Sequence, residues 1–361
     1  MNAISRRIVV GSAVITLALT MAACGKAGDK SSDNKKDKTI GLLLPDTVTA
    51  RYEKFDRPLI TSKIKELCSD CTVQYDNAAG DAAKQAQQVS SMIARGVKVL
   101  ILDAQDAVGI KSSVQAAVDK GIKVVAYDRL AQGPVSAYVS YDNEKVGELQ
   151  GQALLDAMGS SATPQTKIVM INGDEADPNA AEFKAGAHKV LDGKVAIAYE
   201  QSGQWKDTVA NQKVQAAITS VGKANIKGVY SANDTMAGGI ATALKANNMS
   251  SVPLTGQDAD LTAIQRILLG TQSSTVYKAA KPEAENTAQI AVDLLEGKDF
   301  KSVADTTKES GSKDQVPSKL LDAVSVTKAN IKDTVIADGT YTVGQVCTAD
   351  FAKACEAAGI K

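Results

Sequence analysis

At positions 124–129 the chain reads Val124-Val125-Ala126-Tyr127-Asp128-Arg129, an apolar run that ends in a carboxylate and a guanidinium. Such a run is typical of a strand buried on both faces of a parallel sheet. Asp128 and Arg129 would then lie where the strand leaves its sheet, and in open α/β folds ligands bind outside the carboxyl ends of the strands. The pair is therefore either part of a ligand site or an ordinary ion pair at a loop start.

Strands and helices alternate on both sides of this stretch. The pattern predicts earlier strands at residues 39–44, 71–75 and 97–102, with a first helix at 50–67. Later strands are predicted at residues 167–172, 195–201, 226–231, 252–256 and 273–278. This alternation indicates mostly parallel sheets with right-handed crossovers. We expect an α/β protein with two Rossmann-like, doubly wound lobes around a cleft.

The N-terminus has the pattern of a secretory signal. Arg6 and Arg7 precede a short apolar run, which is shorter than the 20 or so residues that a membrane-spanning helix needs. Met21-Ala22-Ala23-Cys24 follows and resembles a bacterial lipobox, in which the cysteine is acylated and becomes the new N-terminus. Residues 1–23 are therefore predicted to be a lipoprotein signal peptide, Cys24 the lipid attachment site, and residues 24–38 a flexible tether. The predicted location is extracytoplasmic, on the outer face of the cell membrane.

Cysteine usage agrees with that location. If Cys24 is lipidated, four of the five cysteines remain, and an even number outside the cell indicates two disulfides. Three pairings are open, and the local one, Cys68 with Cys71 and Cys347 with Cys355, is preferred. The spacing of Cys68 and Cys71 also fits a redox motif, but the pair is expected late in a helix rather than at a helix start, where a thiolate would be stabilised.

Composition excludes several classes of partner. The 361 residues carry zero net charge, so neither a nucleic acid nor another polyanion is implied as a partner. There is one histidine, which removes metal sites built from several histidines, and neither a metal nor a cofactor is predicted. Aromatic residues are only 4% of the chain, with a single tryptophan, Trp205.

Polar and aromatic side chains follow the predicted strands in both lobes. Carboxylates, amides, cations and rings together suit a neutral polyhydroxylated ligand, because each hydroxyl both donates and accepts hydrogen bonds and ring faces pack on sugar C–H groups. The predicted ligand-binding residues are Arg51, Tyr52, Asp128, Arg129, Asp177, Asn179, Trp205, Asn233, Asp258 and Lys278.

Each of these residues also has a simpler interpretation. Trp205 could be core, and Lys278 could be a solvated lysine at a strand end. Asn233-Asp234 has the pattern of a helix N-cap, a role that we assign to Asp234. Asp76 and Asp103 are expected at the rim of the site.

Longer motifs resemble a known family. They are Tyr127-Asp128-Arg129, the stretch from Asp142 to Gln150 (DNEKVGELQ), the stretch from Gly256 to Leu261 (GQDADL) and Thr275-Val276-Tyr277-Lys278. They resemble the bacterial periplasmic D-xylose-binding proteins, which belong to the ribose/galactose-type sugar-binding proteins of ABC importers. The resemblance runs from about Thr39 to Gly339.

The resemblance implies how the ten residues are used. In the family two lobes joined by three crossovers close on one sugar, and a tryptophan follows the arginine that Arg51 matches. Here Tyr52 stands in its place, and Pro178 replaces the middle residue of the family's Asp-Asn-Asn segment. Trp205 matches the family's second stacking tryptophan, while Asn233, Asp258 and Lys278 match its polar clamp.

The resemblance also suggests a domain organisation. The N-terminal lobe is expected to comprise residues 39–142 and 280–325, and the C-terminal lobe residues 143–279 and 326–345. Residues 346–361 form a tail outside the resemblance, which is expected to be a disulfide-pinned cap on a lobe.

The function implied is that of a lipid-anchored, monomeric substrate-binding protein for D-xylose or a similar monosaccharide. It would close on its ligand at a hinge and dock on the membrane subunits of an ABC permease.

Three alternatives are weighed. A sugar sensor for a chemoreceptor or kinase would use the same closed form. A glycoside hydrolase would need a protonated acid, whereas nearby cations are expected to keep the acids ionised. A cytoplasmic regulator would carry a DNA-binding segment where this chain has its signal. We therefore predict that the protein is not an enzyme. The sequence does not decide which sugar or anomer is bound.

Overall fold

The structure is a computed structural model that describes residues 38–311 and 315–361. The predicted signal peptide, Cys24 and the tether up to residue 37 lie outside the described residues. Within residues 38–311 and 315–361, none of the helices combines the length and apolar composition that crossing a bilayer requires.

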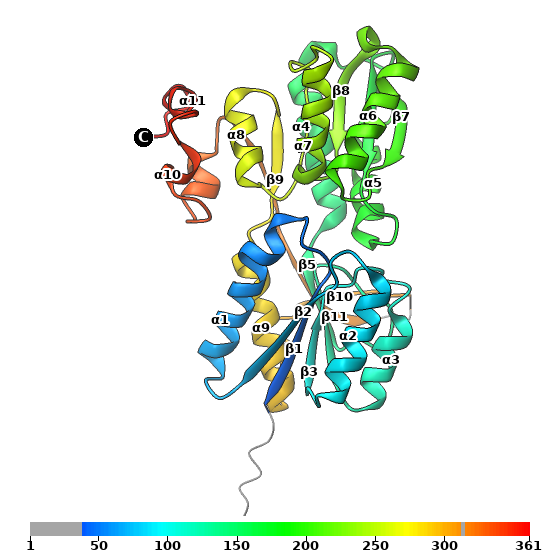
Figure 1. Ribbon diagram of the computed structural model, residues 1–361, viewed down its shortest axis with the longest axis vertical. Helices are drawn as coiled ribbons and strands as arrows, with labels where there is room; N and C mark the ends of the chain where they lie inside the picture. Colours follow the sequence, from blue (N-terminus) through cyan, green and yellow to red (C-terminus); the bar gives the residue numbers. More distant parts are fainter. Residues whose placement is uncertain (1–37, 312–314) are drawn as a thin grey trace, which may run out of the picture. The chain divides into compact units, whose positions relative to one another are not determined.

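The first lobe is built on a seven-stranded sheet with the order β10-β11-β5-β4-β3-β1-β2 (Figure 1). Its strands are β1 (Thr39–Leu44), β2 (Thr72–Asn77), β3 (Val99–Leu102), β4 (Lys123–Tyr127), β5 (Ala137–Tyr141), β10 (Thr306–Lys308) and β11 (Val316–Leu321). All neighbours pair in parallel except β10 with β11. The predicted strand at 124–127 is confirmed as β4, and all four of these residues are fully buried.

Helices cover both faces of this sheet, as an all-parallel arrangement requires. α1 (Arg57–Leu67) and α9 (Ala280–Glu296) lie side by side on one face, and α2 (Ala82–Ala94) and α3 (Lys111–Asp119) lie on the other (Figure 1). Each face has its own apolar cluster, one with Ile60 and Ala288 and the other with Val89 and Val114. The sheet is therefore anchored on both sides, and its strand ends are held at one edge.

The helix predicted at 50–67 is confirmed, since helical residues run from Ala50 to Leu67. Within this run Tyr52–Asp56 forms a π-helical segment, η1, and α1 begins at Arg57. Pro58 stands in the first turn of α1 and has no N–H to donate to the turn before it. The α-helical ladder therefore cannot run unbroken through that proline, which agrees with the π-helical turn directly before it.

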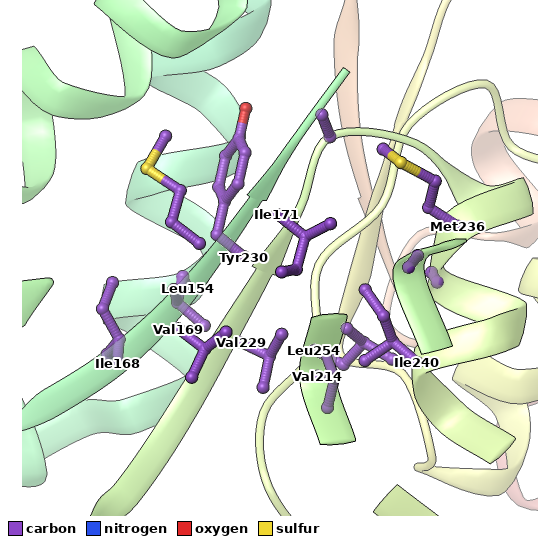
Figure 2. Close-up of a cluster of buried hydrophobic side chains, with 14 of the residues drawn as sticks. Leu154, Ile168, Val169, Ile171, Val214, Val229, Tyr230, Met236, Ile240 and Leu254 are labelled. Carbon is purple, nitrogen blue, oxygen red and sulfur yellow. The ribbon is translucent and has the colours of Figure 1, made fainter. Parts of the chain in front are cut away.

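The second lobe has a three-stranded parallel sheet, β7-β6-β8, and an antiparallel pair, β12-β9. Figure 2 shows apolar side chains of β6, β8, α4, α6 and α7 meeting in one cluster. The strands are β6 (Lys167–Asn172), β7 (Ala196–Ser202), β8 (Ile226–Ser231), β9 (Ser274–Tyr277) and β12 (Val324–Thr327). The helices are α4 (Asn143–Met158), α5 (Pro178–Leu191), α6 (Asp207–Val221), α7 (Asp234–Ala246) and α8 (Leu261–Leu269). Short turns are η2 (Gly159–Ser161) and η3 (Lys223–Asn225).

The strand predicted at 252–256 is wrong. Leu254 makes only an isolated bridge with Val229, and Gln257 makes another with Val276. Pro253 accepts a hydrogen bond from the Val229 N–H but cannot donate one, so a ladder cannot extend through it. The segment still links β8 to β9, because its two bridges reach both strands.

Disulfides join neighbouring elements in the local pairing that the sequence favoured. Cys68 at the end of α1 is bonded to Cys71 just before β2, and Cys347 is bonded to Cys355 in the tail. The tail, here residues 332–361 and so longer than the predicted 346–361, contains η4 (Lys332–Ile336), α10 (Val343–Val346) and α11 (Ala352–Ala357). It packs against α8 in a cluster that includes Ile264, Tyr341 and Cys355. The exact division of the chain between the lobes stays a prediction.

Removing the tail disulfide should destabilise the protein. Loop-closure entropy predicts that Cys347→Ser/Cys355→Ser lowers the free energy of unfolding by about 2–3 kcal/mol. Urea denaturation of the oxidised protein, followed by circular dichroism, measures this. An unchanged free energy of unfolding would show that the tail does not unfold together with the lobes.

Candidate functional site

One pocket lies where the strand ends of the two lobes meet. All ten residues singled out in the sequence line it, which brings together side chains up to 227 positions apart. Their role in ligand binding stays a prediction. The lining residues are Thr49, Arg51, Tyr52, Asp128, Arg129, Asp177, Asn179, Phe183, Trp205, Asn233, Gln257, Asp258 and Lys278.

These side chains reach the cavity from the ends of strands and the starts of helices. Asp128 and Arg129 follow β4, and Lys278 follows β9. Asp177 is the N-cap of α5 and accepts a hydrogen bond from the Asn179 N–H. Because parallel strands end at the same edge of their sheet, the side chains that follow these strands lie close together at that edge.

The backbone is strained at three of the lining residues. Asp128, Trp205 and Asp258 have φ values of 55°, 58° and 91°, and their neighbours Gln204 and Ala259 also lie at positive φ. Such a conformation costs a non-glycine residue about 1–3 kcal/mol and persists only when the surroundings hold it. The strain therefore marks the cavity as a place where side-chain direction is fixed at a cost in stability.

Hydrogen bonds to the backbone hold Asp128 in this conformation. Its N–H donates to the Val139 carbonyl at 2.9 Å. Its carbonyl accepts from the Tyr138 hydroxyl at 3.0 Å, the Ser140 hydroxyl at 2.7 Å and the Asn179 amide at 3.0 Å. Asn179 belongs to the second lobe, so one lobe fixes the turn that aims a side chain of the other.

Three buried cations organise the charge of the site. Arg51 pairs with Asp56 at 2.9 Å, with Asp128 at 3.6 Å, and with Glu283 of α9.

The other two cations lie nearer the second lobe. Arg129 pairs with Asp177 at 2.9 Å and lies 3.6 Å from Asp103. Lys278 lies 3.3 Å from Asp258 and 3.9 Å from Asp128. Asp128 and Arg129 are thus joined to groups of the second lobe by charge.

Six carboxyl groups surround these three cations, so not all of them can ionise at low cost in a buried site. Burial raises the pKa of Asp177 to about 6 and that of Glu283 to about 8, although Arg129 and Arg51 oppose the two shifts. Burial also raises the pKa of Asp103. The expectation that cations keep the acids of the site ionised concerns Asp128 and Asp258, and none of these three acids is part of it.

Asp128 behaves in the opposite way. Burial opposes its charge, but Lys278, Arg51 and Arg129 together hold the pKa of its carboxyl below the ordinary value. The ionised Asp128 accepts a hydrogen bond from the Tyr52 hydroxyl at 3.3 Å, and that hydroxyl accepts one from Arg129 at 3.1 Å. An ionised carboxylate accepts hydrogen bonds and does not donate protons.

Several buried polar atoms around the cavity have no hydrogen-bond partner among the described residues. They are Nη1 of Arg51, Oδ1 of Asp128, Oε1 of Gln257 and Oδ1 of Asp258. Three of these atoms still have an ion-pair partner, since Nη1 of Arg51 lies 3.6 Å from Oδ1 of Asp128 and Oδ1 of Asp258 lies 3.3 Å from Nζ of Lys278. They nevertheless lack the full hydrogen bond that a buried polar group needs. Donors and acceptors are both represented, so the site suits a ligand that can supply both.

Aromatic rings form the second lobe's side of the cavity. Trp205 packs edge-on against Phe183 with ring centroids 6.3 Å apart, and its indole N–H donates to Asp177 at 3.1 Å. Gly173 makes this possible, because a Cβ there would lie 2.0 Å from the indole ring. The simpler interpretation of Trp205 as core is partly right, since its side chain belongs to the apolar cluster of the lobe while it also lines the cavity.

Sequence reasoning missed three lining residues, Thr49, Phe183 and Gln257. Phe183 could have been found, since it lies four residues after Asn179 and so on the same face of α5. Gln257 directly precedes Asp258, and only Asp258 of these two adjacent polar residues was predicted to bind the ligand. Thr49 is held by Asp46, which accepts its N–H at 2.7 Å, and no signal in the sequence pointed to it.

Two assigned roles need correction. Asn233, not Asp234, caps α7, since its side chain accepts the Met236 N–H at 2.9 Å. Asp103 is fully buried behind Arg129, and Asp76 pairs with Arg95 away from the cavity, so neither lies at the rim of the site.

This chain is similar in sequence to known proteins. A family model described as a periplasmic binding protein domain matches residues 40–299. The D-xylose-binding periplasmic protein of Escherichia coli (strain K12) is 40% identical over 314 residues, covering 85% of this chain and 92% of that protein. Its namesake in Haemophilus influenzae is 38% identical over 320 residues, covering 86% of this chain and 93% of that protein.

A solved structure shares the fold. The carbohydrate transporter solute-binding protein of Chloroflexus aurantiacus, in complex with D-glucose, superposes with a TM-score of 0.76 at 27% identity. The match covers 85% of this chain and 97% of that one.

The raised pKa of Glu283 predicts a pH-dependent stability. Folding holds a proton on this acid that the unfolded chain, with its ordinary pKa near 4.3, loses. The stabilisation that this proton gives the folded protein is therefore complete at low pH and is lost as pH rises through about 8. We expect the free energy of unfolding to fall by about 3 kcal/mol between pH 5.5 and 8.5 from this group, measured by urea denaturation.

Glu283→Gln should remove most of that slope, because an amide does not titrate. Glu285→Gln, two residues along α9, is the matched control and should keep the slope of the unaltered protein. If Glu283→Gln unfolds with the same pH dependence as the unaltered protein, the proton is not held on Glu283.

Proposed function

We propose, because this chain belongs to the periplasmic binding protein family, that it is the substrate-binding protein of a sugar ABC importer and binds D-xylose or a similar monosaccharide. It has the type I periplasmic binding protein fold. The proposed ligand-binding residues are the ten predicted from the sequence, joined by Thr49, Phe183 and Gln257.

The observation that carries the proposal is the set of buried polar atoms around the cavity that make no hydrogen bond to the described residues. Arg51 offers an N–H, whereas Asp128, Gln257 and Asp258 offer oxygens. A sugar hydroxyl can accept from the first and donate to the others at the same time. A phosphate fits less well, because its negative charge would face the carboxylates of Asp128 and Asp258.

The aromatic lining of the pocket favours a sugar ring. Trp205 and Phe183 provide ring surface for the C–H face of a pyranose, and Tyr52 lies beside the carboxylate of Asp128. Which hydroxyl pairs with which residue sets the specificity, since a missing hydroxyl leaves a buried group unpaired at about 1–3 kcal/mol.

We further propose that binding is coupled to closure of the two lobes. Residues of both lobes line the cavity, so a ligand gains all its contacts only when the lobes are together. The Arg129–Asp177 ion pair and the bond from Asn179 to Asp128 support this, because each joins one lobe to the other. The closed form is the one proposed to dock on the permease as a monomer.

An enzymatic role is not part of the proposal. Asp177 has the pKa of a general acid, but its carboxylate accepts from Asn179 and Trp205 and pairs with Arg129, so both oxygens are occupied. Incubation with aryl glycosides should therefore release no phenol, and sustained release would contradict the proposal.

Titration calorimetry with a panel of pentoses and hexoses tests the binding function. We expect saturable binding of at least one of them, most strongly D-xylose or a close analogue. Asp128→Ala should weaken it well over tenfold, because it removes a charged acceptor and leaves Arg51 and Lys278 without their shared partner. Asp119→Ala on the exposed face of α3 is the control and should bind as the unaltered protein does. Absence of binding to every pentose and hexose would reject the proposal.

We also propose that lipid on Cys24 anchors the protein to the outer face of the cell membrane. The lipobox-like Met21-Ala22-Ala23-Cys24 and the polar stretch after it support this. Cys24→Ser should move the protein from the membrane fraction to the aqueous fraction of cells and abolish the mass increase of acylation. Recovery of the unaltered protein in the aqueous fraction, with no added lipid mass, would contradict the anchor.

A further inference from the structure

The segment Gln257–Asp260 carries two of the cavity's lining residues in a strained conformation. Asp258 and Ala259 both have positive φ, at 91° and 51°. Consecutive non-glycine residues in this region are uncommon and need support from outside the loop. The side chains of Gln257 and Asp258 can point into the cavity only while that support is in place.

Asp234 provides the support, although it does not line the cavity. Its side chain is buried, and its Oδ2 accepts the Asp260 N–H at 2.9 Å. Its own N–H donates to the Gln257 carbonyl at 2.9 Å. One residue therefore holds both ends of the strained segment.

Thr275 extends this support to the middle of the segment. Its hydroxyl donates to Oδ2 of Asp234 at 2.8 Å and accepts the Ala259 N–H at 3.1 Å. The Asp258 N–H is taken by the Val276 carbonyl at 2.8 Å. The hydroxyl thus connects the carboxylate to Ala259, the second residue at positive φ.

Oδ1 of Asp234 is held from the other side. It accepts from the Gln272 amide at 2.7 Å, and Gln272 in turn accepts from Arg266 at 2.9 Å. Arg266 also donates to the Asp234 carbonyl at 3.0 Å. A Cβ at residue 256 would lie 1.9 Å from Oδ1, so only glycine fits beside it. The carboxylate is enclosed by groups that fix its position.

Helix capping does not explain this arrangement. Asn233 already caps α7, and the hydrogen bonds of the Asp234 carboxylate go to residues 260, 272 and 275, none of which belongs to α7. Burial, together with the nearby charge of Asp260, raises the pKa of Asp234 well above its ordinary value, and the donors Gln272 and Thr275 only partly oppose this shift.

We propose that Asp234 is a positioning residue for ligand binding, which holds Asp258 and Gln257 in their strained conformation through Asp260 and Thr275. The proposal rests on the proposed sugar-binding function. Asp234 acts on the ligand only through these neighbours.

Asp234→Asn tests the proposal with little change of shape. An amide has one acceptor oxygen, so either the Gln272 amide or the Asp260 N–H must face the NH2 group and lose its partner. We expect the affinity for D-xylose, measured by calorimetry and by the fluorescence of the single tryptophan, to fall 10- to 100-fold. Thr275→Val, which removes only the bridging hydroxyl, should lower it at least threefold. Asp293→Asn alters a buried acid of α9 that is bonded to Gln289, and this matched control should bind within twofold of the unaltered protein.

A double-mutant cycle separates positioning from general destabilisation. If Asp234 acts through Asp258, then Asp234→Asn should cost less than threefold in a protein that already carries Asp258→Asn. A purely structural effect would cost the same in both backgrounds. Unchanged affinity in both Asp234→Asn and Thr275→Val, or additive losses in the cycle, would overturn the proposal.

Amide hydrogen exchange tests the same support without any ligand. Asp234→Asn should speed exchange at residues 258–260 at least tenfold in the free protein and leave β4 unchanged, whereas Asp293→Asn should alter neither. If no sugar binds but this local change appears, the proposed function fails while the support of the segment stands. If sugar binds and the exchange of residues 258–260 is unchanged, only the positioning role fails.

Discussion

Ionisation of one buried carboxylate, that of Asp128, is the condition on which the rest of the site depends. Arg51 and Lys278 both approach its Oδ1, and Arg129 adds a third positive charge nearby. Cations buried this deeply need further acids, which the chain supplies in both lobes. Because those acids outnumber the cations, burial raises the pKa of Glu283 and Asp103, which do not line the cavity. Asp128 is thus an ionised hydrogen-bond acceptor that faces the ligand. Glu283 and Asp103, which do not line the cavity, have raised pKa values that favour their protonated forms.

The same residues are held in strained backbone conformations. Asp128, Trp205 and Asp258 all have positive φ, at about 1–3 kcal/mol each, in a protein whose net stability is expected to be only about 5–15 kcal/mol. Hydrogen bonds from neighbouring elements offset this cost, with three donors on the Asp128 carbonyl and the Asp234 network under Asp258. Strain concentrated at the cavity is what a site needs when side-chain direction matters more than local stability.

Site residues at strand ends could be predicted from the sequence more readily than the residues that hold them in place. Asp128, Arg129 and Lys278 could be found because each follows an apolar strand, and the topology places such residues at one edge. The cap of α7 was assigned to Asp234, whereas Asn233 makes it and also lines the cavity, because a capping pattern does not say which of two adjacent polar residues faces the helix. Asp103 looked like a rim residue, since only the packed structure shows Arg129 lying between it and the cavity.

The tail beyond the family match also contributes to the cavity's support. Ala259, next to Asp258, packs in the same apolar cluster as Tyr341 and Cys355. Tyr341 in turn lies edge-on to Phe55 of η1, with ring centroids 5.9 Å apart, and η1 begins with Tyr52 of the cavity. The segment that carries Asp258 is thus held by the Asp234 network through hydrogen bonds and by the tail through apolar packing. The tail thus packs against η1 of the first lobe and against Ala259, the neighbour of Asp258, and the sequence did not predict these two contacts.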